Sequence, residues 1–79
     1  MPIKILFFGS TAEIIGKREI EIELTSSSKA ERVFEGLIAE YPRLVAHSLL
    51  FSINQQYATG EEILKDGDEL AIFTAVSGG

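Results

Sequence analysis

The stretch that decides the fold is residues 19–41, EIEIELTSSSKAERVFEGLIAEY. Its first six residues alternate strictly between glutamate and an aliphatic residue, which is typical of a strand with one buried face. From Ala30 to Tyr41 apolar residues recur at spacings of three and four, which predicts an amphipathic helix. Ser28 and Glu31 have the spacing of a capping box, and Pro42 stops the helix. The sequence therefore predicts a half-buried strand followed by one full-length helix.

Three further strands are expected around this pair. Residues 3–8 and 70–75 are apolar on both faces, so we expect them side by side in the middle of a sheet. Residues 49–54 predict another strand, whereas the strand at 19–24 is polar on its outer face and suits an edge position. Because a single helix can cover only one face of a sheet, the pattern predicts an α+β fold with the sheet packed on one main helix.

Shorter elements connect these segments. They are a helical turn over 11–15 ended by Gly16, a turn or short extended piece over 55–60, a helical turn through Leu64 capped by Thr59 and Glu62, and a tight turn at 66–68. The chain contains neither repeats nor a low-complexity linker. We therefore expect one domain over 1–75 and a flexible tail over 76–79.

Composition excludes several classes of function. A chain of 79 residues has no room for a second domain and makes a large enclosed active site improbable. Seven Lys and Arg against twelve Asp and Glu give a net charge of −5, which argues against nucleic acid as a partner. The absence of cysteine excludes disulfides and thiolate zinc sites and favours a cytoplasmic location. Apolar runs of at most four residues are too short for a membrane span.

Few residues have the pattern of a catalytic or metal-binding group. The glutamates at 19, 21 and 23 are expected to be the solvent face of a strand rather than a metal site. His47 lacks a recognisable catalytic partner, and the acidic run at 66–69 lacks the ligand spacing of a calcium loop. We expect no bound cofactor, no metal and no catalysis by this chain alone.

Four apolar residues are predicted to lie on the face of the sheet that the helix does not cover. They are Leu6, Phe8, Ala71 and Phe73. An exposed apolar patch on an acidic chain favours a surface that binds a partner protein. The alternative is that a loop, either 10–16 or 55–65, folds across the patch.

The chain ends in two glycines, Gly78 and Gly79. Glycine has no Cβ, so such a tail can enter a narrow slot and bring its carboxylate close to the catalytic groups of another protein. A carboxylate becomes an acyl electrophile once ATP has converted it to an adenylate, and that chemistry would belong to a partner enzyme. The alternative is a frayed end without a function.

Four stretches together resemble the family of small subunits of molybdopterin synthase, which are ubiquitin-like β-grasp sulfur carriers. They are Lys4-Ile5-Leu6-Phe7-Phe8, Asn54-Gln55, Leu64-Lys65-Asp66-Gly67-Asp68-Glu69-Leu70 and Val76-Ser77-Gly78-Gly79. The resemblance spans essentially the whole chain. It implies a mixed sheet wrapped around one helix.

The resemblance also implies an activity and partners. An adenylating enzyme of the ubiquitin-activating type would use ATP to activate Gly79, and a sulfur donor would then produce a thiocarboxylate. The tail of Val76, Ser77, Gly78 and Gly79 would enter the large catalytic subunit, in a heterotetramer of two small and two large subunits. Sulfur would pass there to cyclic pyranopterin monophosphate in molybdenum cofactor biosynthesis. Phe8 and Phe73 match the aromatic contacts of the family to that subunit.

Two positions depart from the family pattern. Thr74-Ala75 replaces a common Pro-Pro pair, so we expect either a more mobile tail or a longer last strand. Ala12-Glu13 replaces a common Arg-Glu pair. Three alternative functions remain open: a sulfur carrier of the thiazole branch of thiamin synthesis, a ubiquitin-like modifier of lysines, and a β-grasp interaction domain whose tail has no role.

Overall fold

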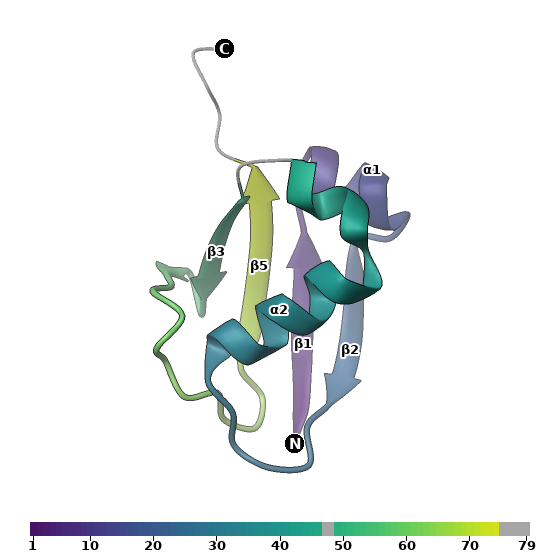
Figure 1. Ribbon diagram of the computed structural model, residues 1–79. Helices are drawn as coiled ribbons and strands as arrows, with labels where there is room; N and C mark the ends of the chain where they lie inside the picture. Colours follow the sequence, from purple (N-terminus) through teal and green to yellow (C-terminus); the bar gives the residue numbers. More distant parts are fainter. Residues whose placement is uncertain (47–48, 75–79) are drawn as a thin grey trace.

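A five-stranded mixed sheet with one long helix across a single face forms the body of the protein, as the computed structural model shows (Figure 1). The structure describes residues 1–46 and 49–74. The elements in chain order are β1 (Pro2–Phe7), α1 (Ser10–Ile15), β2 (Glu19–Glu23), α2 (Ala30–Glu40), the 3₁₀ helix η1 (Pro42–Ala46), β3 (Leu49–Ile53), β4 (Gln56–Tyr57) and β5 (Glu69–Thr74).

The strand order is β2-β1-β5-β3-β4, which confirms that the first and last strands lie in the middle and that β2 is an edge. β1 and β5 run parallel, with Leu6 opposite Ala71, while the other pairs are antiparallel. Both central strands therefore end at the same end of the sheet. β5 continues to Thr74, which pairs with Leu49. The replacement of the proline pair thus goes with a strand that reaches Thr74; Ala75 lies outside the described residues.

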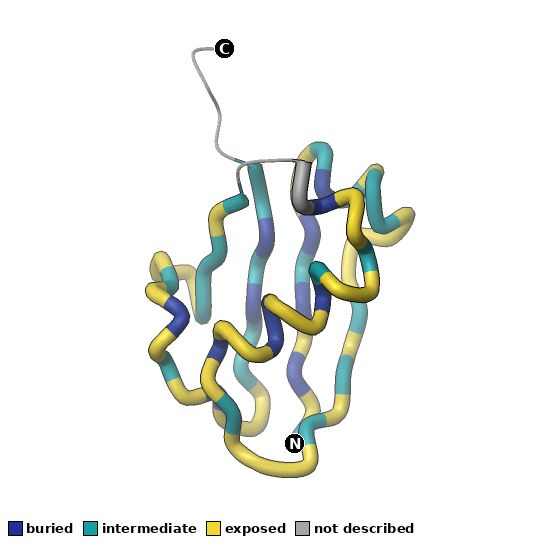
Figure 2. The backbone as a smooth tube through the Cα atoms, in the orientation of Figure 1, coloured by how far each residue is buried: buried dark blue, intermediate teal, exposed yellow. Residues whose placement is uncertain are grey.

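The core lies between the sheet and α2, where the buried residues of both line up (Figure 2). Its fully or almost fully buried members are Ile3, Ile5, Phe7, Ala30, Val33, Phe34, Leu37, Leu64, Leu70 and Ile72. The rings of Phe34 and Phe51 stack with their centroids 3.8 Å apart. Ile22 and Leu24 are only half-buried, because β2 is at the edge of the sheet. The predicted helix stripe therefore meets the predicted inward residues of the strands.

The N-terminus of α2 is not closed by the predicted capping box. The hydroxyl of Ser28 lies 3.4 Å from the carbonyl of Ser26, and Lys29 occupies the cap position without a side-chain hydrogen bond. The N–H groups of Ala30 and Glu31 donate instead to carbonyls of a distant loop, Glu62 and Gly60, at 2.8 and 3.0 Å. The capping prediction was wrong because backbone carbonyls brought by the fold already satisfy these donors.

That same loop is extended where a helical turn was predicted. Ile63 forms a bridge with Lys29, and the N–H of Leu64 donates to Ser28 at 2.9 Å, so the segment bonds to the chain before α2 rather than to itself. Thr59 and Glu62 do interact: the Glu62 carboxylate accepts the Thr59 N–H at 2.8 Å and the Gly60 N–H at 2.9 Å. The hydrogen bonds between Thr59 and Glu62 thus stabilise a loop and not a helix.

The other short elements agree with the sequence predictions. Gly16 ends α1 with a left-handed backbone, φ 84°, and its N–H donates to Ala12. Asn54 and Gln55 turn the chain between β3 and β4 with positive φ, and Gly67 does so in the tight turn before β5. The Asn54 side chain links these turns: it donates to Asp68 and accepts the N–H of Glu69, each at 3.0 Å.

Candidate functional site: the open face of the sheet

The face of the sheet opposite α2 carries the predicted apolar residues. Leu6, Phe8, Ala71 and Phe73 line one hollow of about 280 Å³, together with Ser52, Gln55 and Glu69. Phe8 exposes 51% of its surface, whereas its neighbour Phe7 exposes 3% and points into the core. The predicted facing of these four residues is therefore confirmed, while their contact with a partner stays a prediction.

Two further residues belong to this face and were missed from the sequence. Leu50 pairs with Phe73 across β3 and β5 and is 37% exposed. Tyr57 pairs with Ser52, is 74% exposed, and holds its ring 6.1 Å from that of Phe73. The Asn54-Gln55 turn is the signal that could have placed Tyr57, because a two-residue hairpin fixes the register of its strands. We call Leu6, Phe8, Leu50, Tyr57, Ala71 and Phe73 the apolar patch.

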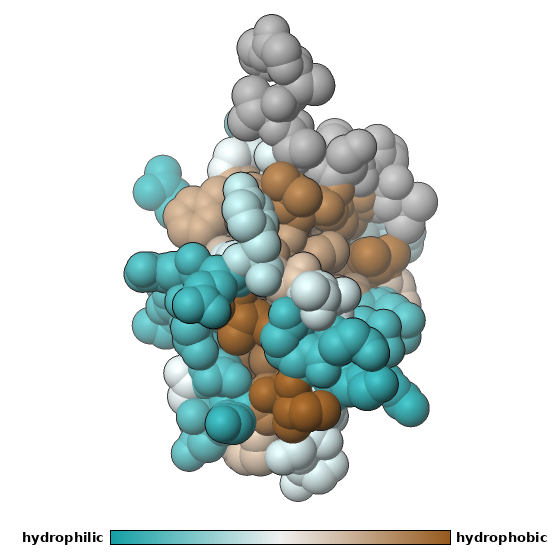
Figure 3. All heavy atoms as spheres, turned by 90° about the vertical axis from the view of Figure 1, so that its left-hand side faces the viewer, coloured by the Kyte–Doolittle hydropathy of each residue, from teal (hydrophilic) through white to brown (hydrophobic). Residues whose placement is uncertain are grey.

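Neither candidate loop covers the apolar patch. The segment at 58–64 runs on the helix side, where its carbonyls bond to α2 and Leu64 enters the core. α1 lies at the end of the sheet and contacts β1, β5 and η1 (Figure 1). From the β3 side, hydrophobic side chains are most extensive toward the end of the molecule where β5 ends, hydrophilic ones flank the middle, and smaller hydrophobic groups lie between and below them (Figure 3). Of residues 55–65, only Gln55 and Tyr57 lie on this face, and Phe8 stays 51% exposed, so neither loop folds across the apolar patch.

Side-chain hydrogen bonds that were missed from the sequence hold the end of β5 to α1. Thr11 is fully buried, and its hydroxyl lies 2.6 Å from the carbonyl of Phe8 and 3.0 Å from that of Ile72. The Ser10 hydroxyl donates to the Thr74 hydroxyl at 3.3 Å. No periodicity marks Thr11, since its partners are the residue that follows β1 and a residue of β5. These bonds fix the point from which the chain continues toward residue 79.

A second and larger hollow of about 660 Å³ lies beside the apolar patch, between α1, the end of β1 and the turn into β2. Leu6 and Phe8 line both hollows. Ala12, at the position where the family pattern has arginine, lines this one, and a short side chain there leaves the space open. This hollow is therefore apolar at Leu6 and Phe8, where it adjoins the apolar patch, and charged at its other side, where Glu13, Lys17, Arg18 and Glu19 line it.

The predicted tail residues Val76, Ser77, Gly78 and Gly79 lie outside the residues that the structure describes, as does His47. The last described residue is Thr74, so the role of the Gly79 carboxylate stays a prediction from the sequence. Between positions 1 and 46 and between 49 and 74, no three His, Cys, Asp or Glu residues are grouped so as to hold a metal ion. Within the same ranges no helix is long and apolar enough to cross a membrane.

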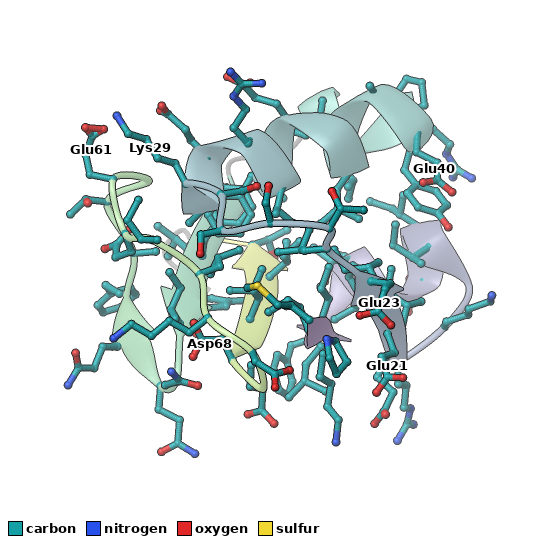
Figure 4. The ribbon with its side chains drawn as sticks, turned by 90° about the horizontal axis from the view of Figure 1, so that it is seen from below. Glu21, Glu23, Lys29, Glu40, Glu61 and Asp68 are labelled. Carbon is teal, nitrogen blue, oxygen red and sulfur yellow. The ribbon has the colours of Figure 1, made fainter. Side chains whose placement is uncertain are left out.

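Charge separates the two ends of the open face. Away from the apolar patch, Lys4 is paired in register with Glu21 on one side and Glu69 on the other. Glu23 accepts from the N-terminal ammonium group of Met1 at 2.6 Å. Seen from the end that carries the N-terminus, Glu21 and Glu23 extend from β2 on one side of the molecule and Asp68 lies near the turn before β5 (Figure 4). The open face is thus apolar at one end, and at the other it carries Lys4 between glutamates.

Comparisons with known proteins agree with this architecture. A model of the ThiS family matches residues 5–79. The molybdopterin synthase sulfur carrier subunit of Chlamydomonas reinhardtii is 39% identical over 83 residues, which cover 100% of both chains. The small archaeal modifier protein 1 of Methanosarcina acetivorans has a solution structure with a TM-score of 0.78 and 28% identity, covering 99% of this chain and 96% of that one.

A structure from Helicobacter pylori 26695, a complex of subunits 1 and 2 of the molybdopterin-converting factor, contains a chain with a TM-score of 0.70 and 21% identity over 100% of both chains. These structures confirm the ubiquitin-like β-grasp fold, a mixed sheet packed on one main helix. The family match covers nearly the whole sequence, and the algal relative aligns from end to end. This chain therefore belongs to the ThiS family, as its resemblance to the sulfur carriers predicted.

Proposed function

We propose that this protein is the sulfur-carrier subunit of a molybdopterin synthase and that its reactive group is the carboxylate of Gly79. The observation that carries the proposal is the 39% identity, over the full length of both chains, to a protein named as that subunit. The family match to residue 79 includes the two terminal glycines. The chain supplies the acyl group, and partner proteins supply the catalytic side chains.

The proposed chemistry has three steps. A carboxylate oxygen of Gly79 attacks the α-phosphate of ATP on an adenylating enzyme, so that pyrophosphate leaves and an acyl-adenylate forms. A sulfide-equivalent nucleophile from the sulfur donor then displaces AMP and leaves a thiocarboxylate. In the large subunit that sulfur bonds to cyclic pyranopterin monophosphate, and water then hydrolyses the thioester, so that the sulfur stays on the pterin and Gly79 returns to a carboxylate. ATP is a substrate of the activating partner and no cofactor of this chain.

The described residues support this role because they hold the end of β5, from which the tail continues, beside the apolar patch. Thr11 and Ser10 hold the end of β5 at a fixed place, so the five residues that follow Thr74 start from a defined point. The apolar patch lies beside that point, because β1 and β5 are parallel and end together. A partner that binds Phe8 and Phe73 would therefore find the tail next to its contact surface. Leu50 and Tyr57 extend this proposed interface.

Mass spectrometry of the intact protein tests the proposal directly. Incubation with ATP, the adenylating enzyme and a sulfur donor from the same organism should raise the mass by the replacement of one oxygen with sulfur. A variant that lacks Gly79 should keep its mass. The proposal fails if the full chain never changes while an established carrier is converted in parallel. Feeding the product to the large subunit or to a thiazole synthase then separates the molybdopterin branch from the thiamin branch.

A ubiquitin-like modifier is the second candidate, because a protein named small archaeal modifier protein 1 is 28% identical and shares the fold. This function predicts covalent adducts of higher mass in cells. The adducts should disappear when Gly79 is deleted and persist when Phe73 is changed. If no adduct depends on Gly79, the modifier function is excluded and the carrier function is untouched.

A further inference from the structure

β2 is an edge strand with a free row of backbone groups. The N–H of Leu24 donates to Met1 and the N–H of Phe7 donates to Arg18, so the even-numbered residues of this strand bond toward β1. Hydrogen-bonding sides alternate along an antiparallel strand. The N–H and C=O groups of Glu19, Glu21 and Glu23 therefore point away from the sheet, where no other described strand pairs with them.

An apolar groove runs beside this edge on the helix side. It has a volume of about 380 Å³ between β2 and α2, and Ile22, Leu24, Val33 and Leu37 supply its apolar wall. Gly36 also lines it, and a Cβ at Gly36 would meet no atom within 4 Å. The space beside the edge is thus open to the side chains of an added strand.

Carboxylates flank the groove from both elements. Glu19, Glu21 and Glu23 are exposed on β2, and Glu40 lines the groove at the end of α2. Figure 4 shows Glu21, Glu23 and Glu40 on the same side of the molecule. Arg32 is the one cation among the groove residues. The β2 edge therefore has exposed carboxylates along the strand and an apolar groove on its helix side.

We propose that the β2 edge binds an extended peptide segment of a partner protein in which basic and aliphatic residues alternate. Such a segment would add a sixth strand through the backbone groups of Glu19, Glu21 and Glu23. Because side chains alternate along a strand, its lysines or arginines would lie beside the glutamates and its valines or isoleucines above the groove.

A second copy of this chain fits the edge poorly. Pairing two β2 strands would bring two rows of three glutamates together, and like charges directly across a ladder destabilise it. The other edge, β4, has only two residues. The proposal is independent of the proposed function, since the β2 edge involves neither the tail nor the apolar patch.

Amide NMR of the full chain with a short peptide that alternates lysine and valine tests the proposal. The amide protons of Glu19, Glu21 and Glu23 should gain protection from exchange on titration, while those of Ile20 and Ile22 are already bonded. A peptide of the same composition, with its lysines in one block and its valines in another, is the control for non-specific attraction. Equal binding of the two peptides, or protection elsewhere than on β2, would overturn the proposal.

Two variants separate the groove from the charges. Gly36→Leu should fill the groove and weaken binding about tenfold while keeping the fold, since leucine is a better helix former than glycine. Gly36→Ala is the matched control and should bind like the natural chain. Glu21→Lys should weaken binding by about tenfold at low salt and less at high salt. Protection of the β2 amides that grows with protein concentration, without peptide, would show self-pairing and overturn the proposal.

Discussion

Two consecutive phenylalanines, Phe7 and Phe8, lie on opposite faces of the same sheet. Phe7 is 3% exposed in the core under α2, and Phe8 is 51% exposed in the apolar patch. The same contrast holds along β5, where Ile72 is fully buried and Phe73 lines the open hollow. The two faces have similar side chains and differ in whether an element covers them. Hydrophobicity alone therefore does not distinguish a residue that stabilises the fold from one available to a partner.

The difference between the faces follows from the number of helices. α2 covers one face, and the loop at 58–64 completes that layer by bonding to the N-terminus of α2. No other helix or loop of the described residues covers the opposite face of the sheet. An apolar surface left exposed costs solubility, so we attribute the apolar patch to function. Stability should depend on the covered face and partner binding on the open one.

Replacing the two phenylalanines one at a time should have the largest effect and tests the comparison most directly. Phe7→Ala removes a buried ring and should lower the free energy of unfolding by about 3–5 kcal/mol. Phe8→Ala removes an exposed ring and should lower it by less than about 1 kcal/mol. Urea unfolding of both variants gives the two values. Similar losses would mean that the open face is part of the core.

Thr11→Val should have the next largest effect. Valine keeps the shape of threonine but removes the hydroxyl that lies 2.6 Å from the Phe8 carbonyl and 3.0 Å from that of Ile72. Both carbonyls also accept a backbone N–H, so the loss should be about 1 kcal/mol. Thr11→Ser, which keeps the hydroxyl, is the control. Faster amide exchange at the end of β5 in Thr11→Val alone would show that the Thr11 hydroxyl holds the end of β5 to the segment that follows β1.

The sequence was sufficient to predict the parts of the structure that depend on local pattern. Alternation placed β2 and its glutamates, the spacing of α2 placed its buried stripe, and the two-faced apolar strands placed β1 and β5 in the middle. These predictions succeed because burial imposes a period of two or about 3.6 on a strand or a helix.

Predictions that depended on contacts between distant segments failed or were not made. Ser28 and Glu31 matched a local capping box, but the Glu31 N–H that Ser28 would have capped donates to Gly60, about 30 residues away. Thr11 bonds to the carbonyl of Ile72, 61 residues along the chain. Hydrogen bonds of this kind leave no periodic signal. Tyr57 was missed for another reason, because the register set by the Asn54-Gln55 turn was not used. The tail was predicted from composition and resemblance and lies outside the described residues.

Acid should weaken the loop that completes the covered face. The Glu62 carboxylate accepts backbone hydrogen bonds, of which the one from the Thr59 N–H has the largest effect, followed by those from the N–H groups of Glu62 itself and of Gly60. These bonds hold the pKa of Glu62 below its ordinary value of 4.5. The unfolded chain therefore takes up the proton more readily, so this stabilisation is present above pH 4.5 and is lost as the pH falls through the lower pKa. Glu62→Gln should reduce that part of the pH dependence in unfolding experiments. Amides of Ala30 and Glu31 that lose protection in acid in the natural chain would support the assignment.

Binding to the partner should not change as the pH falls from 5 through the lowered pKa of Glu62, as long as the protein stays folded, because this residue lies on the helix side. A loss of binding that tracks the titration of Glu62 would break the separation of the two faces. Glu61→Gln is a matched control, since Glu61 has an ion pair with Lys29 at 3.5 Å but accepts none of the bonds that hold the loop. It should leave the acid sensitivity of unfolding unchanged.

Phe73→Asp should have the smallest effect on folding, although Phe73 lies on a central strand. Its side chain is half-buried and lines the open hollow, so the charge can reach water and the free energy of unfolding should fall by no more than about 1 kcal/mol. Binding to the large subunit should be lost, because a carboxylate would replace an aromatic contact in the proposed interface. A normal cooperative melt with lost binding supports the open face as that interface. Loss of the melt would place Phe73 in the core, and intact binding would move the interface elsewhere.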